Sequence, residues 1–150
     1  MSHHIPPKYP RAQALCVFYN NGKILVYEAA DSVKNETFYR PLGGGIHFQE
    51  MGSNAAKREI MEELGEDTED ISCIGMLENI YMYEGEPGHE IVLVFDGKFN
   101  NKELYKKERI KTLEGPKSGY AIWKNLNDFV HKGHTLYPDG LKALLQKHFI

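Results

Sequence analysis

The sequence contains few cysteines and no long apolar run. Its 150 residues include two cysteines, Cys16 and Cys73, which argues against a disulfide framework of the kind that small secreted domains use. Each lies within an apolar run, so we expect two buried free thiols. No apolar stretch approaches the roughly 18 residues of a membrane span. The N-terminal segment MSHHIPPKYP has no apolar core of a secretory signal, so the sequence predicts a cytoplasmic protein with no membrane partner.

The chain also lacks an excess of positive charge. Its 18 lysines and arginines face 21 acidic residues, for a formal net charge of −3. Proteins that bind nucleic-acid polymers need a clearly basic face, so the charge balance argues against such a partner. A single small nucleotide remains possible, because metal ions and a few basic side chains can neutralise its phosphates.

Repeats, low-complexity tracts and linkers are absent as well. A length of 150 residues suits one domain, and we expect a single domain over residues 1–150, with residues 1–10 as a flexible tail. With 41% hydrophobic residues, the composition is that of an ordinary globular protein.

Runs rich in apolar and β-branched residues predict that most of the chain is strand. An Asn-Gly pair at 21–22 predicts a tight hairpin turn, Gly75 a break in a strand, and GEPG at 85–88 a turn. The continuously apolar run 91–95 predicts a strand buried on both faces. The expected strands are 12–19, 23–29, 70–84, 91–95 and 120–123, with an extended piece at 38–42 and a polar loop at 101–119.

Helices are expected at 54–64, at 139–149 and, as a short turn, from 126. Ser53 or Asn54 can cap the first of these, and Gly65 suits its C-terminal end. The order of elements predicts an α/β fold in which helices cover both faces of a mixed β-sheet.

Three carboxylates, Glu59, Glu62 and Glu63, share one turn of the helix expected at 54–64. At about 100° per residue they fall within one arc, beside an apolar stripe of Ala56, Ile60 and Leu64. The pair Glu59 and Glu63 costs an isolated helix roughly 0.2–0.5 kcal/mol by like-charge repulsion, and the helix dipole disfavours acids near the C-terminus. Local stability therefore argues against the arrangement.

Two interpretations of the cluster remain open on helix chemistry. It is a solvated acidic face, eased by Lys57 and by an ion pair of Arg58 with Glu62, or it binds a divalent cation. Mg²⁺ and Mn²⁺ suit clustered carboxylates and leave coordination positions for substrate phosphates. The run Gly43–Gly45 allows the backbone to approach a ligand or an ion closely, which favours the second interpretation.

The spacing of these residues resembles the Nudix box. Gly44 is followed after five residues by Glu50, then after seven by Arg58, Glu59 and Ile60, and the pattern ends with Glu62, Glu63 and Gly65. The one departure is Glu66, where the family usually has an apolar residue, and we expect a local packing adjustment there. The RPLGGGI entry, the HEIVLVF strand, a strand ending in Trp123 and a late YPDGL are also similar to the surroundings of the box in that family.

Membership of the Nudix family implies an α/β/α sandwich with a central mixed sheet. It also implies metal-dependent hydrolysis of a pyrophosphate bond in a nucleoside diphosphate linked to another moiety, with Mg²⁺ or Mn²⁺ as cofactor. By position, the resemblance makes Glu59, Glu62 and Glu63 metal ligands, of which one can instead orient the attacking water, and makes the Gly43 carbonyl a further ligand. Arg58 would hold a glutamate in place, so the implied catalytic residues are Glu59, Glu62 and Arg58, with Glu50 as an accessory acid.

Some family members use a further glutamate outside the box. The usual place for it, about three residues before the tryptophan, holds Tyr120 in this chain. Glu90, at the start of the apolar strand, and Glu114, in the polar loop, are the candidate substitutes. Each is more simply explained as an ordinary surface acid, which leaves the number of metal ions and the general base open.

On the substrate side, Tyr81 and Tyr83 resemble the aromatic residues of the diadenosine polyphosphate branch, which stack on a base. A period of two puts both on one face of a strand, but core tyrosines show the same spacing. Arg40 is a candidate for phosphate binding and Glu90 a candidate substrate-side residue. Weaker candidates, more simply explained as surface or structural residues, are Lys106, Lys107, Lys117 and His89.

Two classes of function follow. The first is a Mg²⁺- or Mn²⁺-dependent hydrolase of a small nucleotide, and the second is a nucleotide-binding regulator on the same scaffold with little or no catalysis. The intact acid cluster favours the enzyme, because regulators commonly lose a glutamate of the box. Homodimers are frequent in the family, so a homodimer is a possible partner state, although no sequence feature identifies its interface.

Overall fold

Two β-sheets form the centre of the molecule in the computed structural model, which describes residues 6–150. The first sheet has the order β5-β1-β7-β6. In it β1 pairs in parallel with β7, whereas β5 and β6 are antiparallel to their neighbours, so the sheet is mixed. Its strands are β1 (Arg11–Val17), β5 (Leu42–Gly45), β6 (Thr68–Tyr83) and β7 (Glu86–Phe99).

The second sheet has the order β2-β3-β9-β8, with β4 paired to β3. All of its pairings are antiparallel. Its strands are β2 (Tyr19–Asn20), β3 (Lys23–Asp31), β4 (Glu36–Arg40), β8 (Arg109–Lys111) and β9 (Tyr120–Asn125).

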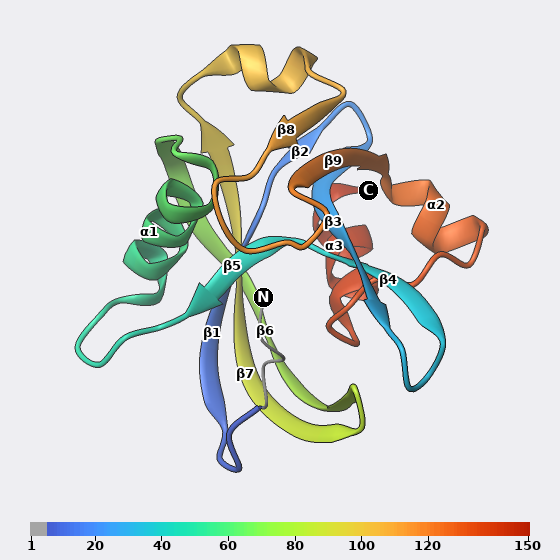
Figure 1. Ribbon diagram of the computed structural model, residues 1–150. Helices are drawn as coiled ribbons and strands as arrows, with labels where there is room; N and C mark the ends of the chain where they lie inside the picture. The colour runs from blue at the N-terminus through green and yellow to red at the C-terminus, as the bar shows by residue number, and fades with distance from the viewer. Residues whose placement is uncertain (1–5) are drawn as a thin grey trace.

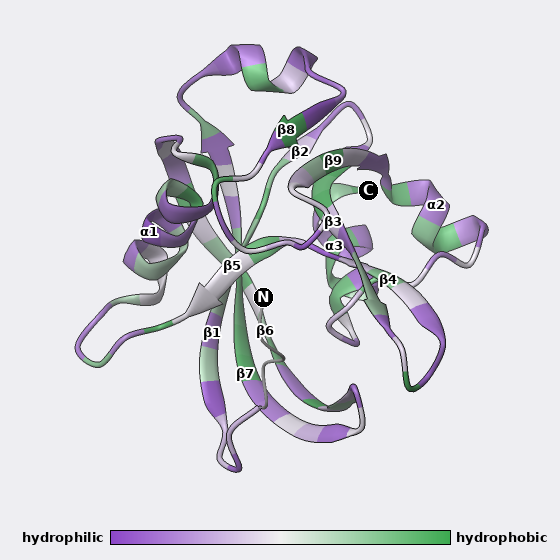
Figure 2. Cartoon of the chain, viewed as in Figure 1, coloured by the Kyte–Doolittle hydropathy of each residue, from purple (hydrophilic) through white to green (hydrophobic). Residues whose placement is uncertain are grey.

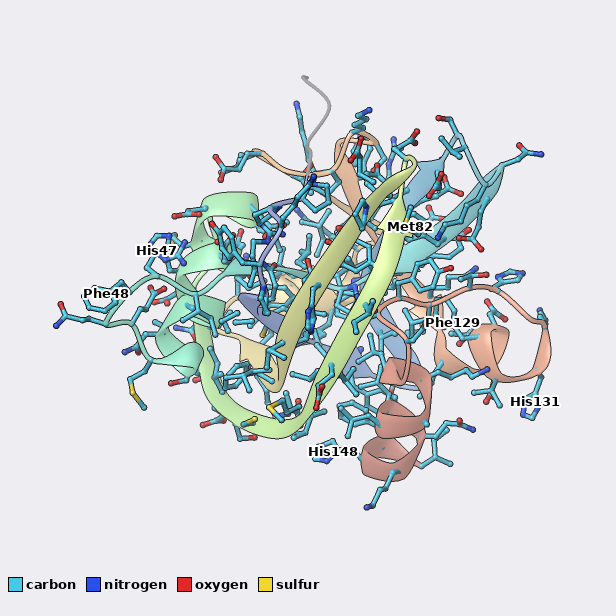
Figure 3. All side chains as sticks on the ribbon, turned by 90° about the horizontal axis from the view of Figure 1, so that it is seen from below. His47, Phe48, Met82, Phe129, His131 and His148 are labelled. Carbon is cyan, nitrogen blue, oxygen red and sulfur yellow. The ribbon has the colours of Figure 1, made fainter. Side chains whose placement is uncertain are left out.

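Helices lie on opposite sides of these strands. The helix α1 (Gly52–Leu64) covers one side, whereas α2 (Leu126–His131) and α3 (Leu141–Phe149) cover the other (Figure 1). A short 3₁₀ helix, η1 (Lys102–Lys106), precedes β8. Seen from below, α1 and α3 stand on either side of the long β6–β7 hairpin (Figure 3). This arrangement confirms the predicted α/β fold with a mixed sheet between helices.

The central strands are buried on both faces, as the run 91–95 predicts. Along β1, Ala14 and Cys16 pack into a core shared with α1, whereas Leu15 and Val17 pack into a second core shared with α2 and α3. Figure 2 shows the apolar stretch of β7 in the middle of the molecule. Because both faces are covered, the sequence shows continuous apolar runs instead of alternation.

Local turn chemistry sets several of the boundaries. Asn21 and Gly22 both have positive φ, 50° and 81°, and close the predicted hairpin between β2 and β3. Gly65 ends α1 in the left-handed conformation, with its N–H bonded to the carbonyl of Met61. The predicted break in the long β6 strand is a register shift between Cys73 and Gly75.

The start of α1 differs from the prediction. The helix begins at Gly52 after Met51, and neither Ser53 nor Asn54 caps it. A Cβ on Gly52 would lie 2.8 Å from a methyl carbon of Leu93, so the first turn packs directly on β7. Close packing of a glycine, and not a capping side chain, determines where this helix starts.

Two further predictions were wrong. The turn expected at 85–88 is formed by Glu84 and Gly85, both with positive φ, and Pro87 already pairs with Met82 inside the sheet. Cys73 is exposed, whereas Cys16 is buried as expected. β6 is the last strand of its sheet, so an apolar run there does not imply burial on both faces.

The N-terminal segment precedes the first strand without forming a helix or strand over residues 6–10, and Pro6 is buried. The flexible tail expected over residues 1–10 falls in part on residues 1–5, which lie outside the described residues. Within residues 6–150, no helix is both long enough and apolar enough to cross a membrane.

Candidate active site

Two of the clustered glutamates lie against the glycine run. Glu59 and Glu63 project from α1 toward β5, where a Cβ on Gly44 would come within 2.5 Å of the Glu59 carboxyl carbon. The N–H of Gly43 donates to Oε1 of Glu63 at 3.1 Å. Gly43 has a φ of 154°, and a Cβ there would lie 2.1 Å from the carbonyl oxygen of Ala14. The glycines therefore allow two carboxylates to lie directly on the backbone.

The two carboxylates repel each other in a desolvated environment. Glu63 is 5% exposed, and burial together with the negative charge of Glu59 raises the pKa of Glu63 to about 8. Adjacent carboxylate oxygens that oppose each other's ionisation are the donor set that a hard divalent cation prefers. The residues present therefore fit a Mg²⁺ or Mn²⁺ ion.

Arg58 joins the helix to the loop between β5 and α1. Its Nε and Nη2 donate to the two carboxylate oxygens of Glu50, at 2.8 and 3.0 Å, and Nη2 also donates to the carbonyl of Gly45. Phe48, at the tip of this loop, is 92% exposed and points away from the body of the molecule (Figure 3). Hydrogen bonds from the Arg58 guanidinium therefore hold this loop, and burial of Phe48 does not.

The same guanidinium also holds two members of the acid cluster. Nη1 of Arg58 donates to Glu59 at 2.9 Å and to Glu62 at 3.1 Å. The Glu62 side chain is 41% exposed, at the outer edge of the cluster. Over residues 6–150 no three acidic, histidine or cysteine side chains converge as a ready metal site, so the structure brings Glu59 and Glu63 together and leaves Glu62 on Arg58.

A cleft of about 1180 Å³ opens beside the acid pair. One end contains Glu59, Glu63 and Gly43, and the walls come from β3, β4, β6 and β7. Tyr81 and Tyr83 both line it, as the period of two predicts, and Phe38 packs edge-on against Tyr83 at 6.2 Å between ring centroids. The cleft therefore joins the acid pair to an aromatic wall.

Glu90 lies at the bottom of this cleft and is 2% exposed. Its oxygens accept hydrogen bonds from Arg11 at 3.2 Å, Arg40 at 3.4 Å and the hydroxyl of Tyr81 at 3.3 Å. The ring of Tyr81 lies over Gly88, where a Cβ would stand 2.2 Å from it. Glu90 thus fixes Arg40 and Tyr81, the two substrate-side candidates, at one place.

Of the two substitutes for the absent glutamate, Glu114 lies by the acid pair. Its charge contributes to the raised pKa of Glu63, and its neighbour Gly115 packs on the Glu63 carboxylate. Tyr120, at the position that the family usually gives to a glutamate, stacks beneath the guanidinium of Arg109 at 4.0 Å. The loop before β9 therefore brings Glu114 to the site.

Lys117 lines the cleft, whereas Lys106 and Lys107 line a separate, smaller pocket next to Trp123, and His89 lines neither. Of the basic residues that the sequence suggested for phosphate binding, Arg40 and Lys117 are therefore the two that line the cleft.

Sequence reasoning missed many of the cleft residues, among them Gln13, Tyr27 and Asn79. Burial raises the pKa of the Tyr27 hydroxyl, an effect that Arg40 opposes and Glu63 and Glu90 reinforce. Gln13 and Asn79 are buried polar residues within strands. A polar residue interrupting a strand pattern was the one signal available for them.

Comparison with known proteins supports the family resemblance. The model of the NUDIX domain family matches residues 8–143. A MutT NUDIX hydrolase from Burkholderia pseudomallei superposes with a TM-score of 0.65 at 18% identity, covering 95% of this chain and 100% of the other. A NUDIX hydrolase from Nitrosomonas europaea gives 0.65 at 14% identity, covering 93% and 88%, and a MutT protein from Methanosarcina mazei Go1 gives 0.61 at 18%, covering 97% and 95%.

Proposed function

Because the chain belongs to the NUDIX domain family over residues 8–143, a family of hydrolases that act on phosphorus anhydrides, we propose that it hydrolyses a pyrophosphate bond in a small nucleotide with the help of Mg²⁺ or Mn²⁺. The observation that carries the proposal is the pair Glu59 and Glu63, packed on the backbone of Gly43 and Gly44 at one end of a large cleft. The two acids repel each other on the helix, and they lie in a cleft that a phosphate chain can enter.

In this proposal Glu59 and Glu63 would hold the cation, together with the carbonyl of Gly43, and Glu62, which Arg58 binds in this structure, would be a further ligand. When bound there, a divalent ion would supply charge neutralisation at the phosphate oxygens and a lower pKa for the attacking water. Arg58 orients Glu59 through the hydrogen bond of Nη1 and keeps the loop with Glu50 on the helix. Glu114 is placed to reach the same water or metal.

The rest of the cleft binds the organic part of the substrate. Arg40 and Tyr81, both fixed by Glu90, and Tyr83 on the aromatic wall are the proposed substrate-binding residues. Glu90 acts through them, because all of its hydrogen bonds go to Arg11, Arg40 and Tyr81.

The proposal is tested by measuring release of phosphate or pyrophosphate from a panel of nucleotides, with Mg²⁺, with Mn²⁺ and with a chelator. The panel includes nucleoside triphosphates, dinucleoside polyphosphates, nucleotide sugars and ADP-ribose. We expect metal-dependent release from at least one class. Replacing Glu59, Glu62 or Glu63 by Gln should lower kcat by orders of magnitude, while Glu66→Gln, just beyond the helix, serves as the control.

The alternative is a nucleotide-binding regulator on the same scaffold. No release from any member of the panel, together with tight and saturable nucleotide binding, would establish the regulator and reject the hydrolase.

A further inference from the structure

Two amide side chains that line the cleft have no hydrogen-bond partner among the described residues. Gln13 on β1 is 4% exposed and Asn79 on β6 is 5% exposed, and both line the cleft. Within residues 6–150 neither side-chain amide makes a hydrogen bond. Within residues 6–150 the buried side-chain atoms without any partner are Thr68 Oγ1 and Asp96 Oδ1, so the amide atoms of Gln13 and Asn79 are open to the cleft. Both amides are therefore available to a ligand group in the cleft, which can take the place of water.

The sheet pairing brings the two amides to one region. Asn79 pairs with Glu90 across β6 and β7, and Arg11 pairs with Glu90 from the other side across β1 and β7. Gln13 stands two residues beyond Arg11 and therefore on the same face of β1. Its Nε2 lies 3.8 Å from the place of a Cβ on Gly45, toward the glycine run. The amides thus extend from the bottom of the cleft toward the acid pair.

The neighbouring charges are already paired. The Glu90 carboxylate is engaged by Arg11, Arg40 and Tyr81, so it leaves the amides free to meet a ligand. A phosphate group at this place would require cations that are not held by a carboxylate, and Lys117, which also lines the cleft, follows Gly115 beside the Glu63 carboxylate instead. The two guanidiniums at the bottom of the cleft both bind Glu90, which favours an uncharged ligand group there.

An amide presents one donor and one acceptor side by side, which is the pattern that Asn and Gln use on the edge of a base. Tyr81, Tyr83 and Phe38 line the same cleft and offer ring faces or edges on which a base can stack. Resting on the proposed function, which places the phosphates at Glu59 and Glu63, we propose that the amides of Gln13 and Asn79 bind the nucleobase of the substrate by hydrogen bonds.

The test removes the amides and keeps their shape. The variants are Q13M, N79L and the double variant Q13M/N79L, and the matched controls are Q146M on α3 and N127L on α2, both outside the cleft. Calorimetric titration without divalent metal uses the 5′-monophosphates of adenosine, guanosine, cytidine and uridine, with ribose 5-phosphate as a probe that lacks the base.

We expect at least one monophosphate to bind the wild type, at least tenfold more tightly than ribose 5-phosphate. Each single variant should weaken that binding by tenfold or more, the double variant should reduce it to the level of ribose 5-phosphate, and the controls should bind as the wild type does. The inference is overturned if none of the four monophosphates binds better than ribose 5-phosphate, or if the double variant retains the preference.

Thermal unfolding separates recognition from a structural role. Because the two amides make no hydrogen bonds inside the protein, Q13M/N79L should melt at the temperature of the wild type or above it. A lower melting temperature accompanied by a proportional loss of binding to all probes, ribose 5-phosphate included, would assign the amides to folding and overturn the inference.

The outcome is also independent of the proposed hydrolase activity. Base-dependent binding that the variants abolish, in a protein that hydrolyses nothing on the nucleotide panel, rejects the hydrolase and keeps the nucleobase subsite. Metal-dependent hydrolysis at the same rate for all bases in the wild type and in Q13M/N79L keeps the hydrolase and rejects the subsite.

Discussion

At the scale of single residues, the glycine run and the acid pair depend on each other. Gly44 leaves the volume that the Glu59 carboxylate occupies, and Gly43 donates its N–H to Glu63. The acids gain a backbone partner and a fixed position, and the glycines have no side chain that would displace them. We therefore expect a methyl group added at these glycines to disturb the site, as the loss of a carboxylate would.

We predict that Gly44→Ala lowers kcat by at least tenfold while the melting temperature changes little. The added Cβ would stand 2.5 Å from the Glu59 carboxyl carbon, and the end of a flexible side chain can move away without unfolding the helix. Gly45→Ala is the matched control, because a Cβ there meets its first atom at 3.8 Å. Equal loss of activity in both variants would contradict the role given to Gly44.

Glu90 provides a second test at this scale. Removing its charge leaves Arg11 and Arg40 without their shared carboxylate, so Glu90→Gln should destabilise the protein by about 2–3 kcal/mol. The value lies below that of a fully buried pair because Arg11 is partly exposed and solvent screens its charge. Urea unfolding measures this, with Glu78→Gln on the exposed face of β6 as the control.

The outcome distinguishes the catalytic role that the sequence allowed for Glu90 from the anchoring of Arg40 that the structure shows. Unchanged stability with turnover reduced by orders of magnitude would make it the general base and contradict its role as the anchor of Arg40. A loss of stability, together with a larger change in KM than in kcat, would support the role of Glu90 in positioning Arg40.

The residues that a motif could reveal were those fixed by spacing along the chain. Glu59 and Glu63 lie on one helix, and Gly44 belongs to the same pattern, so the sequence already implied their association. Gln13 and Asn79 are separated by most of the first half of the chain and meet only because β1, β7 and β6 are neighbours. No local pattern contains that information.

At the scale of elements, the loop between β5 and α1 is held mainly by an ion pair. Glu50 accepts two hydrogen bonds from Arg58 and one from the N–H of His47. These bonds lower the pKa of Glu50 to about 2, from an ordinary value of 4.5. The lowered pKa of the folded state means that the pair stabilises the protein above about pH 4.5, and that this contribution is lost as the pH falls toward 2.

We therefore predict that Glu50→Gln destabilises the protein at pH 6 and that its difference from the wild type shrinks at pH 2.5. Urea midpoints at the two values measure the difference. Glu66→Gln, which lies outside this loop, should show no such pH dependence relative to the wild type. A difference that stays constant between pH 6 and pH 2.5 would contradict the ion pair as the fastening of the loop.

Element boundaries followed from the sequence where backbone chemistry is local. Asn21 with Gly22 and Gly65 adopt positive φ as predicted. The β6–β7 turn was misplaced because Glu84, which carries no turn signal, takes the left-handed conformation, while Pro87 stays within the sheet. A strand pairing that continues on both sides outweighed the turn preference of the Pro-Gly pair.

At the scale of the whole molecule, the cleft is a product of packing between elements far apart in the sequence. Its walls come from strands of both sheets, and the acid pair closes one end. The fold class could be predicted from the order of elements, but the cleft could not, because it depends on which strands meet. The homodimer and the cytoplasmic location stay predictions of the sequence.

Ligand binding should therefore stabilise the protein through two sets of contacts that can be tested separately. One set is at Glu59 and Glu63, and the other is at the amides of Gln13 and Asn79. A nucleotide whose bridging oxygen is replaced by carbon, added with Mg²⁺ at about 100 times its Kd, should stabilise the fold by about 2.7 kcal/mol. For a domain of this size that corresponds to a rise in Tm of about 5–10 °C. Since the metal end and the base end both contribute to binding, removing either should reduce the rise.

We predict that E59Q/E63Q loses the part of the Tm rise that depends on Mg²⁺, whereas Q13M/N79L loses the part that depends on the base. The first variant should respond equally with and without the metal, and the second should respond equally to the nucleotide analogue and to a ribose analogue without a base. The two substitutions act on one bound molecule, so their combination should abolish the rise. A metal-dependent rise that survives in E59Q/E63Q would place the cation elsewhere in the protein and separate the acid pair from the chemistry of the cleft.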